Sequence, residues 1–267
     1  MIFLSGQIAK PNIKRKIMDL NWEYFKVRAS KGLVLGNPLL TKCSSYFRKR
    51  KDYASYSTRM EEKISHTHRC IFIHIPKAAG SSIKNELYDS PYGGSHASAQ
   101  EFRILFPKEY KSYYKFAIVR NPWDRLVSTY NYFLRGGNGS SLDRKVEQKL
   151  KSLKNFEGFC QYLNKSFSPK KKLLPILPHF LPQAFFVTDR YNKSIVDTVL
   201  RYENIQEDFE SINKGAFEGI QLSKLRATKH DCYRSYYTEE TKELIATVYS
   251  KDIQTVSYTH LTLPTKA

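Results

Sequence analysis

The stretch from residue 70 to residue 82 constrains the fold of this chain more than any other. Six mostly apolar, β-prone residues end at Pro76, a short loop follows, and residues 83–87 begin a helical pattern. A strand, a tight loop and a helix in this order bring backbone N–H groups and a helix N-terminus together around an anion. Gly80 lets a ligand approach the backbone closely, and Lys77 adds a mobile positive charge. The predicted phosphate-binding positions are Lys77, Ala78, Ala79, Gly80, Ser81 and Ser82.

This loop differs from the loop that binds nucleoside triphosphates together with magnesium, which reads G-x-x-x-x-G-K-[ST]. Here Ser81 takes the position after Gly80, the early glycine is missing, and Lys77 comes three residues before Gly80. The difference argues against a magnesium–ATP site. It favours a ligand whose charge is neutralised by lysine and backbone amides alone. A strand-to-helix connection with an unrelated lysine remains the alternative for this stretch taken alone.

A second predicted strand, residues 115–119, also runs directly into a predicted helix. Asn121 is a good N-cap residue and Pro122 is a good first helical residue. Ligands bind at the carboxyl ends of strands in open parallel sheets, so Arg120 is well placed for a second phosphate. The planar guanidinium group suits that anion. Ser128 is expected about two turns into the same helix.

These two junctions resemble the motifs of the sulfotransferases that use 3′-phosphoadenosine 5′-phosphosulfate (PAPS), in the carbohydrate-type family 2 branch. Residues 74–82 are similar to the family's 5′-phosphosulfate loop, although Thr is more usual at the positions of Ala78 and Ser81. Residues 116–128 are similar to its 3′-phosphate motif, nearly without departure. The resemblance covers roughly residues 68–253. It implies an α/β fold with a P-loop-type parallel sheet flanked by helices, in a single catalytic domain.

The resemblance also implies a reaction, namely transfer of a sulfuryl group from PAPS to an acceptor hydroxyl, without a metal. Lys77 and its loop would bind the 5′-phosphosulfate, while Arg120 and Ser128 would bind the 3′-phosphate. His96 lies in a His-Ala-Ser-Ala sequence between the two motifs, at the place of the histidine thought to act as base in relatives. His179 is a second candidate for this role. The implied partners are a nucleotide sulfate donor and an anionic or neutral glycan.

The charge of the chain is strongly basic. A formal net charge of +19 and a pI of about 9.6 indicate anionic partners such as a nucleotide, an acidic glycan, nucleic acid or a membrane surface. No run of 18 apolar residues and no signal-peptide pattern is found, so we expect a cytoplasmic enzyme. Peripheral membrane contact stays open. Neither metal-ligand spacing nor a disulfide framework is evident in the four widely spaced cysteines, Cys43, Cys70, Cys160 and Cys232.

The charge pattern divides the chain into three parts. Residues 1–66 contain 14 Lys and Arg against 5 Asp and Glu, with weak periodicity, and are expected to form a basic, poorly ordered or peripheral extension. Residues 67–253 are the expected sulfotransferase domain. Residues 254–267 do not continue the preceding helical pattern and resemble a translated sequencing adapter, so we expect a non-native tail.

Five further elements are predicted from local patterns. Short apolar runs at residues 184–187 and 195–200 predict strands, and residues 205–212 predict a helix. Ser98 followed by Glu101 is a capping box for another helix. A last helix is expected to begin after Thr238 and to end near residue 253.

Two other classes of function stay open at this point. A P-loop kinase or NTPase would need the missing Gly-Lys-[ST] sequence and an Asp at the strand end where this chain has Arg120. A basic module that binds nucleic acid or a membrane would account for the charge of +19. It would leave the two strand-loop-helix motifs unexplained, and we regard nucleic acid as the less favoured partner.

Overall fold

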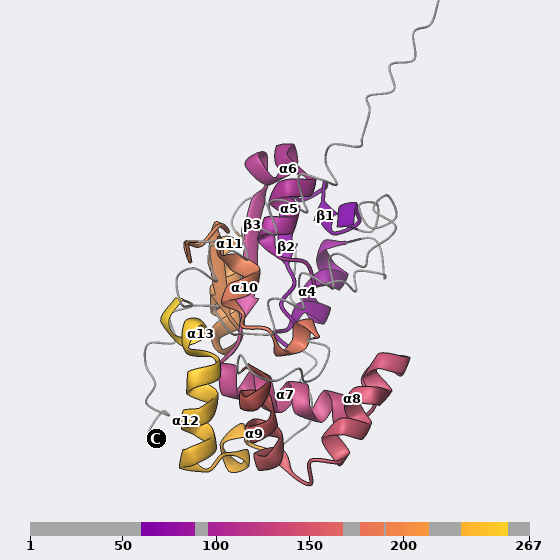
Figure 1. Cartoon of the computed structure of the whole chain (residues 1–267). Helices are drawn as coiled ribbons and strands as arrows, with labels where there is room; N and C mark the ends of the chain where they lie inside the picture. The colour runs from indigo at the N-terminus through magenta and orange to yellow at the C-terminus, as the bar shows by residue number, and fades with distance from the viewer. Residues whose placement is uncertain (1–59, 89–95, 168–176, 190, 214–230, 256–267) are drawn as a thin grey trace, which may run out of the picture.

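The computed structural model describes residues 60–88, 96–167, 177–189, 191–213 and 231–255 (Figure 1). Within these ranges the chain folds into one sheet of four strands in the order β1-β2-β3-β4, covered by helices. The strands are β1 (Ile64–Ser65), β2 (Cys70–Ile73), β3 (Tyr114–Val119) and β4 (Thr198–Arg201). The helices are α4 (Gly80–Leu87), α5 (Ala99–Leu105), α6 (Pro107–Ser112), α7 (Pro122–Leu134), α8 (Ser141–Lys151), α9 (Phe156–Phe167), α10 (Ala184–Val187), α11 (Ile205–Ile212), α12 (Glu239–Val248) and α13 (Ser250–Thr255).

Three of these strands run parallel. Phe72 of β2 pairs with Phe116 of β3, which pairs in turn with Thr198 of β4, whereas β1 pairs antiparallel with β2 at the sheet edge. The predicted α/β fold class is confirmed, and the antiparallel edge strand is an addition that the sequence patterns did not predict. Because the parallel strands end at the same edge, the segments that follow β2, β3 and β4 come together there.

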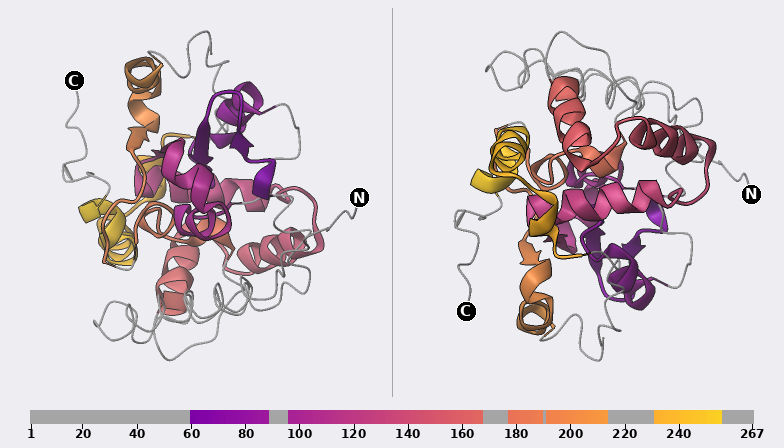
Figure 2. Two further views of the ribbon diagram at one scale, coloured as in Figure 1. Left: turned by 90° about the horizontal axis from the view of Figure 1, so that it is seen from above. Right: turned by 90° about the horizontal axis from the view of Figure 1, so that it is seen from below.

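The apolar side chains of the described residues form two clusters. One surrounds the sheet and includes Phe72, Phe116 and Phe186. The other lies among α7, α8, α9, α12 and α13 and includes Phe133 and Phe159. In Figure 1 the helices of the second cluster lie below the carboxyl ends of the strands, and the view from below in Figure 2 shows α7 crossing the middle of the molecule. The start of α7 therefore lies where the sheet meets the helical cluster.

The helix starts follow the predicted capping patterns. Ser98 and Glu101 form the capping box of α5, which is confirmed with both bonds present. Asn121 caps α7 by accepting hydrogen bonds from the backbone N–H groups of Trp123 and Asp124. Thr238 caps α12. These caps fix the direction in which each helix leaves the preceding loop.

The structure corrects one predicted element. Residues 184–187 form α10 rather than a strand, and the Thr188 N–H donates to the Ala184 carbonyl as in a helix. Phe185 and Phe186 begin this helix by donating to the carbonyls of residues 182 and 183. The prediction was wrong because an apolar run of four residues fits a buried helical turn as well as a strand.

The ends of the predicted domain also differ in detail. Met60 and Ile64 are buried in the core around the sheet, so the folded part of the chain begins before the expected boundary at residue 67. Residues 1–59 and 256–267 lie outside the described residues, and so does most of the expected extension and tail. The last predicted helix is present but breaks at Tyr249, which ends α12 just before α13 begins. No described helix has both the length and the apolar character needed to cross a lipid bilayer.

Candidate active site

The loop between β2 and α4 is held in a compact, strained conformation. Lys77 and Ala79 have φ values of +65° and +60°, in the left-handed region that non-glycine residues seldom adopt. Such residues cost of order 1–3 kcal/mol each and cluster at ligand sites. The predicted strand-loop-helix order is present, with α4 beginning at Gly80, while anion binding by this loop stays a prediction. The buried Ala78 and the first-turn residues Ser81 and Ser82 complete the loop, while contact of the serine hydroxyls with a ligand stays a prediction.

Gly80 is required for a reason that the sequence did not reveal. A Cβ atom at this position would lie 1.8 Å from Cδ2 and 2.0 Å from Nε2 of His74, the residue that follows β2. The positive φ values of the turn are carried by Lys77 and Ala79, not by Gly80. Glycine is needed here because an imidazole ring occupies the space of its side chain.

We expect Gly80→Ala to destabilise the protein by about 1–3 kcal/mol, because the new methyl group overpacks against the His74 ring. Chemical denaturation of the variant measures this loss of stability. The double variant Gly80→Ala/His74→Ala should recover part of it, since the clashing ring is removed. Equal stability of the wild type and Gly80→Ala would show that the ring does not constrain the loop.

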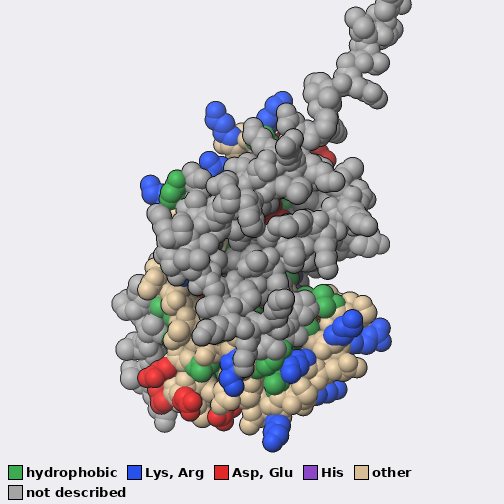
Figure 3. Space-filling model, viewed as in Figure 1, with side chains coloured by type: hydrophobic (Ala, Val, Ile, Leu, Met, Phe, Trp, Pro, Cys, Tyr) green, Lys and Arg blue, Asp and Glu red, His purple; other side chains and the backbone are tan. Residues whose placement is uncertain are grey.

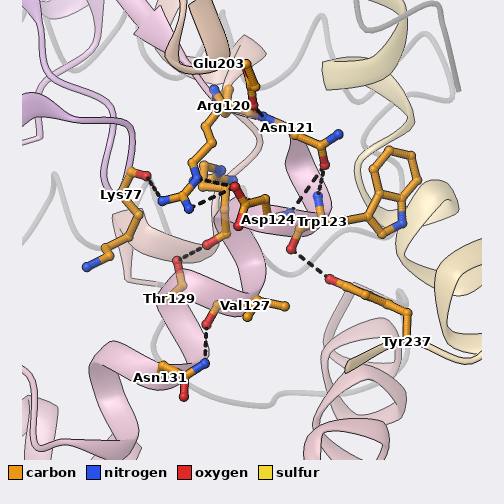
Figure 4. Close-up of polar contacts among 12 residues, drawn as sticks. Lys77, Arg120, Asn121, Trp123, Asp124, Val127, Thr129, Asn131, Glu203 and Tyr237 are labelled. Carbon is orange, nitrogen blue, oxygen red and sulfur yellow. Dashed lines mark hydrogen bonds and ion pairs between the residues drawn. The ribbon is translucent and has the colours of Figure 1, made fainter. Parts of the chain in front are cut away.

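Arg120 connects the two predicted anion-binding positions. It follows β3, its guanidinium is buried, and its Nη1 donates to the backbone carbonyl of Lys77 over 3.3 Å. Figure 4 shows the Lys77 carbonyl facing Arg120, while the lysine ammonium extends away from it. Lys77 and Arg120 thus lie side by side at the carboxyl edge of the sheet, as the parallel strand order requires.

The remaining bonds of Arg120 fix its orientation. Nε donates to Oδ2 of Asp124 over 2.9 Å, and Nη2 forms an ion pair with the same oxygen at 2.8 Å. The guanidinium lies 4.4 Å from the ring centroid of Tyr202. The Gln183 side chain bonds both the N–H and the carbonyl of Arg120, over 2.9 and 2.7 Å. A guanidinium has five N–H donors, and these contacts with Asp124 and Lys77 use three of them. Within the described residues, the guanidinium therefore has two N–H donors that these contacts do not use.

Ser128 lies in the second turn of α7. The residue is wholly buried, with 0% of its surface exposed, and belongs to the helix that Arg120 precedes. Its predicted contact with a 3′-phosphate stays a prediction. Its side chain is packed within the second turn of α7, on the helix whose start lies beside the buried Arg120.

The two candidate bases lie together. The ring centroids of His96 and His179 are 5.1 Å apart, and those of His96 and His74 are 4.5 Å apart. His96 Nδ1 is 3.1 Å from the backbone carbonyl oxygen of His74. A carbonyl oxygen only accepts, so Nδ1 carries the proton and Nε2 keeps a lone pair. This tautomer is the one that a general base needs.

Burial and neighbouring cations lower the pKa values of His96, His179 and Lys77. Burial, together with Lys63, Arg125 and Lys77, lowers the pKa of His96 to about 4 even though its bond to His74 opposes the change. Burial and the adjacent His96 likewise hold the pKa of His179 well below its usual value. The pKa of Lys77 falls to about 8, chiefly through burial and then through Arg120 and Arg135. The site is therefore an enclosed region of excess positive charge, which suits a polyanionic ligand.

The comparison with protein families agrees with this geometry. Residues 61–259 match the model of the Sulfotransferase family, in its family 2 branch. The chain belongs to the sulfotransferase family. It is thus an enzyme of sulfuryl transfer, and the resemblance noted in its two motifs is confirmed. Neither the curated proteins nor the solved structures gave a match.

The described part of this sulfotransferase contains no group of three or more His, Cys, Asp or Glu side chains arranged to hold a metal. The structure adds four residues that sequence reasoning missed. Asp124 and Gln183 orient Arg120, Tyr202 packs against it, and Tyr132 contacts Lys77. Of these, only Asp124 had a usable signal, since it follows Arg120 by four residues. The others are brought in from distant segments.

Arg125 is a further residue of the motif with a role that its spacing did not reveal. It is 1% exposed, and its Nη1 and Nη2 donate to the carbonyls of His179 and Leu181 over 3.3 and 2.6 Å. Arg125 therefore holds the short helical turn Pro178–Phe180 that carries His179. A basic residue only five positions after Arg120 is thus structural, because it points into the core rather than toward the anion site.

Proposed function

We propose that this sulfotransferase takes its sulfuryl group from PAPS and that Lys77 and Arg120 bind the two ends of that donor. The observation that carries the proposal is the 3.3 Å bond from Arg120 to the Lys77 carbonyl, which makes the two cationic positions neighbours. Lys77 and the backbone around residues 78–82 would bind the 5′-phosphosulfate. Arg120, with Ser128, would bind the 3′-phosphate that separates this donor from ordinary adenine nucleotides.

In the proposed reaction the acceptor hydroxyl oxygen attacks the sulfur in line with the bridging oxygen of the 5′-phosphate. The new O–S bond forms as the bridging S–O bond breaks, and the hydroxyl proton moves to Nε2 of His96. Lys77 stabilises the charge that develops on the leaving 5′-phosphate oxygen. Adenosine 3′,5′-bisphosphate leaves. The bond from His96 to the His74 carbonyl supports His96 rather than His179 as the base, because it fixes the required tautomer.

A carbohydrate is the proposed acceptor, and the surface charge favours an anionic one. Figure 3 shows Lys and Arg side chains gathered over α8 and acidic side chains over α12. The exposed cations of α8 and its C-terminal end are Arg144, Lys145, Lys151 and Lys154. A basic surface raises the local concentration of an anionic acceptor and speeds its association at low salt.

Transfer of labelled sulfate from PAPS to a panel of anionic glycans, neutral glycans and small alcohols tests this function. We expect transfer without added metal, with an anionic glycan as the best acceptor, and loss of transfer in His96→Asn. Failure of every acceptor to receive label would contradict the proposed reaction. A preference for small alcohols would overturn only the proposed acceptor.

The pKa of Lys77 gives a pH dependence of donor binding. Lys77 is charged below about pH 8, and a bound anion favours its charged form. The Kd of adenosine 3′,5′-bisphosphate, whose phosphates are fully charged above about pH 7, should therefore be level from about pH 7 to about pH 8 and rise above that, by up to about tenfold per pH unit. In Lys77→Arg the charge persists and the Kd should stay level to about pH 10. Calorimetric titration across this range measures both proteins, and parallel profiles would exclude Lys77 from the binding site.

A further inference from the structure

One side chain, Tyr132 of α7, contacts both the proposed charge-stabilising residue Lys77 and the second candidate base His179. The Lys77 ammonium lies 4.6 Å from the centroid of the Tyr132 ring, within the range of a cation–π interaction. The His179 ring stacks on Tyr132 at 5.3 Å between centroids and 9° between planes. The residue is neither a motif position nor a group that the proposed reaction uses.

The contacts of Tyr132 extend to the binding loop through a continuous array of rings. This array consists of Tyr132, His179, His96 and His74, with centroid distances of 5.3, 5.1 and 4.5 Å between successive members. His74 in turn occupies the space beside Gly80. One end of the array therefore lies against the loop backbone and the other end lies under the Lys77 ammonium.

The Lys77 ammonium has an aromatic ring as its partner. Among the described residues no carboxylate is ion-paired with Lys77. A carboxylate partner would cancel the charge that an anionic donor needs, whereas an aromatic face attracts the ammonium without neutralising it. Burial, with Asp143, raises the pKa of the Tyr132 phenol to about 12, so the ring stays neutral while Lys77 is charged.

We propose that Tyr132 is a positioning residue that holds the Lys77 ammonium where the leaving oxygen of the sulfate donor develops its charge. This inference rests on the proposed function. The physical reason is the flexibility of lysine, whose side chain loses rotamer entropy when it is fixed. The ring fixes the ammonium in the free enzyme, so this cost is not added to the barrier of the transfer step.

The role requires an aromatic face and not the phenolic hydroxyl. Tyr132→Phe should therefore keep kcat within about twofold of the wild type. Tyr132→Leu keeps an apolar side chain but has no ring, and its kcat should fall about tenfold to thirtyfold, in line with the strength of a desolvated cation–π contact. The KM for PAPS should change less than threefold in both variants, because the loop backbone and Arg120 still bind the donor.

The experiment measures kcat, the KM for PAPS and the stoichiometry of adenosine 3′,5′-bisphosphate binding in the wild type, Tyr132→Phe and Tyr132→Leu. The binding stoichiometry counts folded sites, so a merely structural defect lowers the stoichiometry and not kcat per site. A kcat of Tyr132→Leu within twofold of the wild type, or an equal fall in Tyr132→Phe, overturns the proposal.

A second measurement is independent of sulfuryl transfer. In the wild type and Tyr132→Phe, the NMR signals of the Lys77 ε-methylene protons should show an upfield ring-current shift that Tyr132→Leu lacks. If the wild type transfers no sulfate but shows this pattern, the proposed function fails and the contact stands. If the wild type transfers sulfate and the signals are the same in all three proteins, the positioning role fails alone.

Discussion

Lys77→Ala is expected to lower kcat for sulfuryl transfer about 10²–10³-fold, the usual effect of removing one preorganised charge-stabilising group. The Lys77 ammonium faces away from Arg120, although the backbone carbonyl of Lys77 accepts a hydrogen bond from Arg120. The ammonium can therefore contact a different part of the donor from the part that Arg120 binds. Its backbone carbonyl is kept in the variant, and the loop geometry should persist. Steady-state kinetics with PAPS measures the change.

A matched control is Lys108→Ala, which removes an exposed lysine from α6. This change lowers the net charge by the same amount, so it isolates the local effect of Lys77 from the overall basic charge of the protein. Its kcat should equal that of the wild type. Similar kcat values for Lys77→Ala and Lys108→Ala would reject Lys77 as the charge-stabilising group.

Arg120→Ala is expected to weaken binding of adenosine 3′,5′-bisphosphate about 10²-fold, since charge-assisted hydrogen bonds contribute about 1.5–3 kcal/mol each. The structure adds a second effect, because the variant also loses the bond to the Lys77 carbonyl and removes the ion pair between Arg120 and Asp124. Kcat should therefore fall as well, and thermal stability should drop. Calorimetry and thermal unfolding measure the two effects.

The double variant Arg120→Ala/Asp124→Ala separates these two effects. Removing both partners of a buried ion pair costs less than removing one, so the double variant should regain much of the lost stability. It should not regain binding of the bisphosphate, because the guanidinium is still absent. Recovery of binding in the double variant would mean that Arg120 acts only by neutralising Asp124.

Much of this site could be predicted from the sequence because its signals are local. The strand-to-helix junctions at Lys77 and Arg120 each occupy about a dozen consecutive residues, and parallel strands bring such junctions to one sheet edge. The caps at Ser98 and Asn121 depend only on neighbouring backbone groups, and both are present as predicted.

The rest of the site could not be read in this way because it depends on long-range packing. Gln183 bonds Arg120 across 63 positions of the chain, and Tyr132 meets Lys77 across a similar stretch. The need for glycine at position 80 arises from the ring of His74, which is visible only once β2 and α4 are folded together. Residues 184–187 failed as a predicted strand for the same reason, since only their tertiary surroundings select a helix.

Competitive calorimetry with the unmodified protein measures whether the adjoining cationic positions Lys77 and Arg120 together hold a 3′-phosphorylated nucleotide. The structure predicts that adenosine 3′,5′-bisphosphate binds at one site per chain without magnesium, and at least about tenfold more tightly than adenosine 5′-monophosphate, because only the former supplies a 3′-phosphate to Arg120. Equal affinity for the two nucleotides, or preferential binding of ATP with magnesium, would mean that Lys77 and Arg120 do not form a site for a 3′-phosphorylated nucleotide.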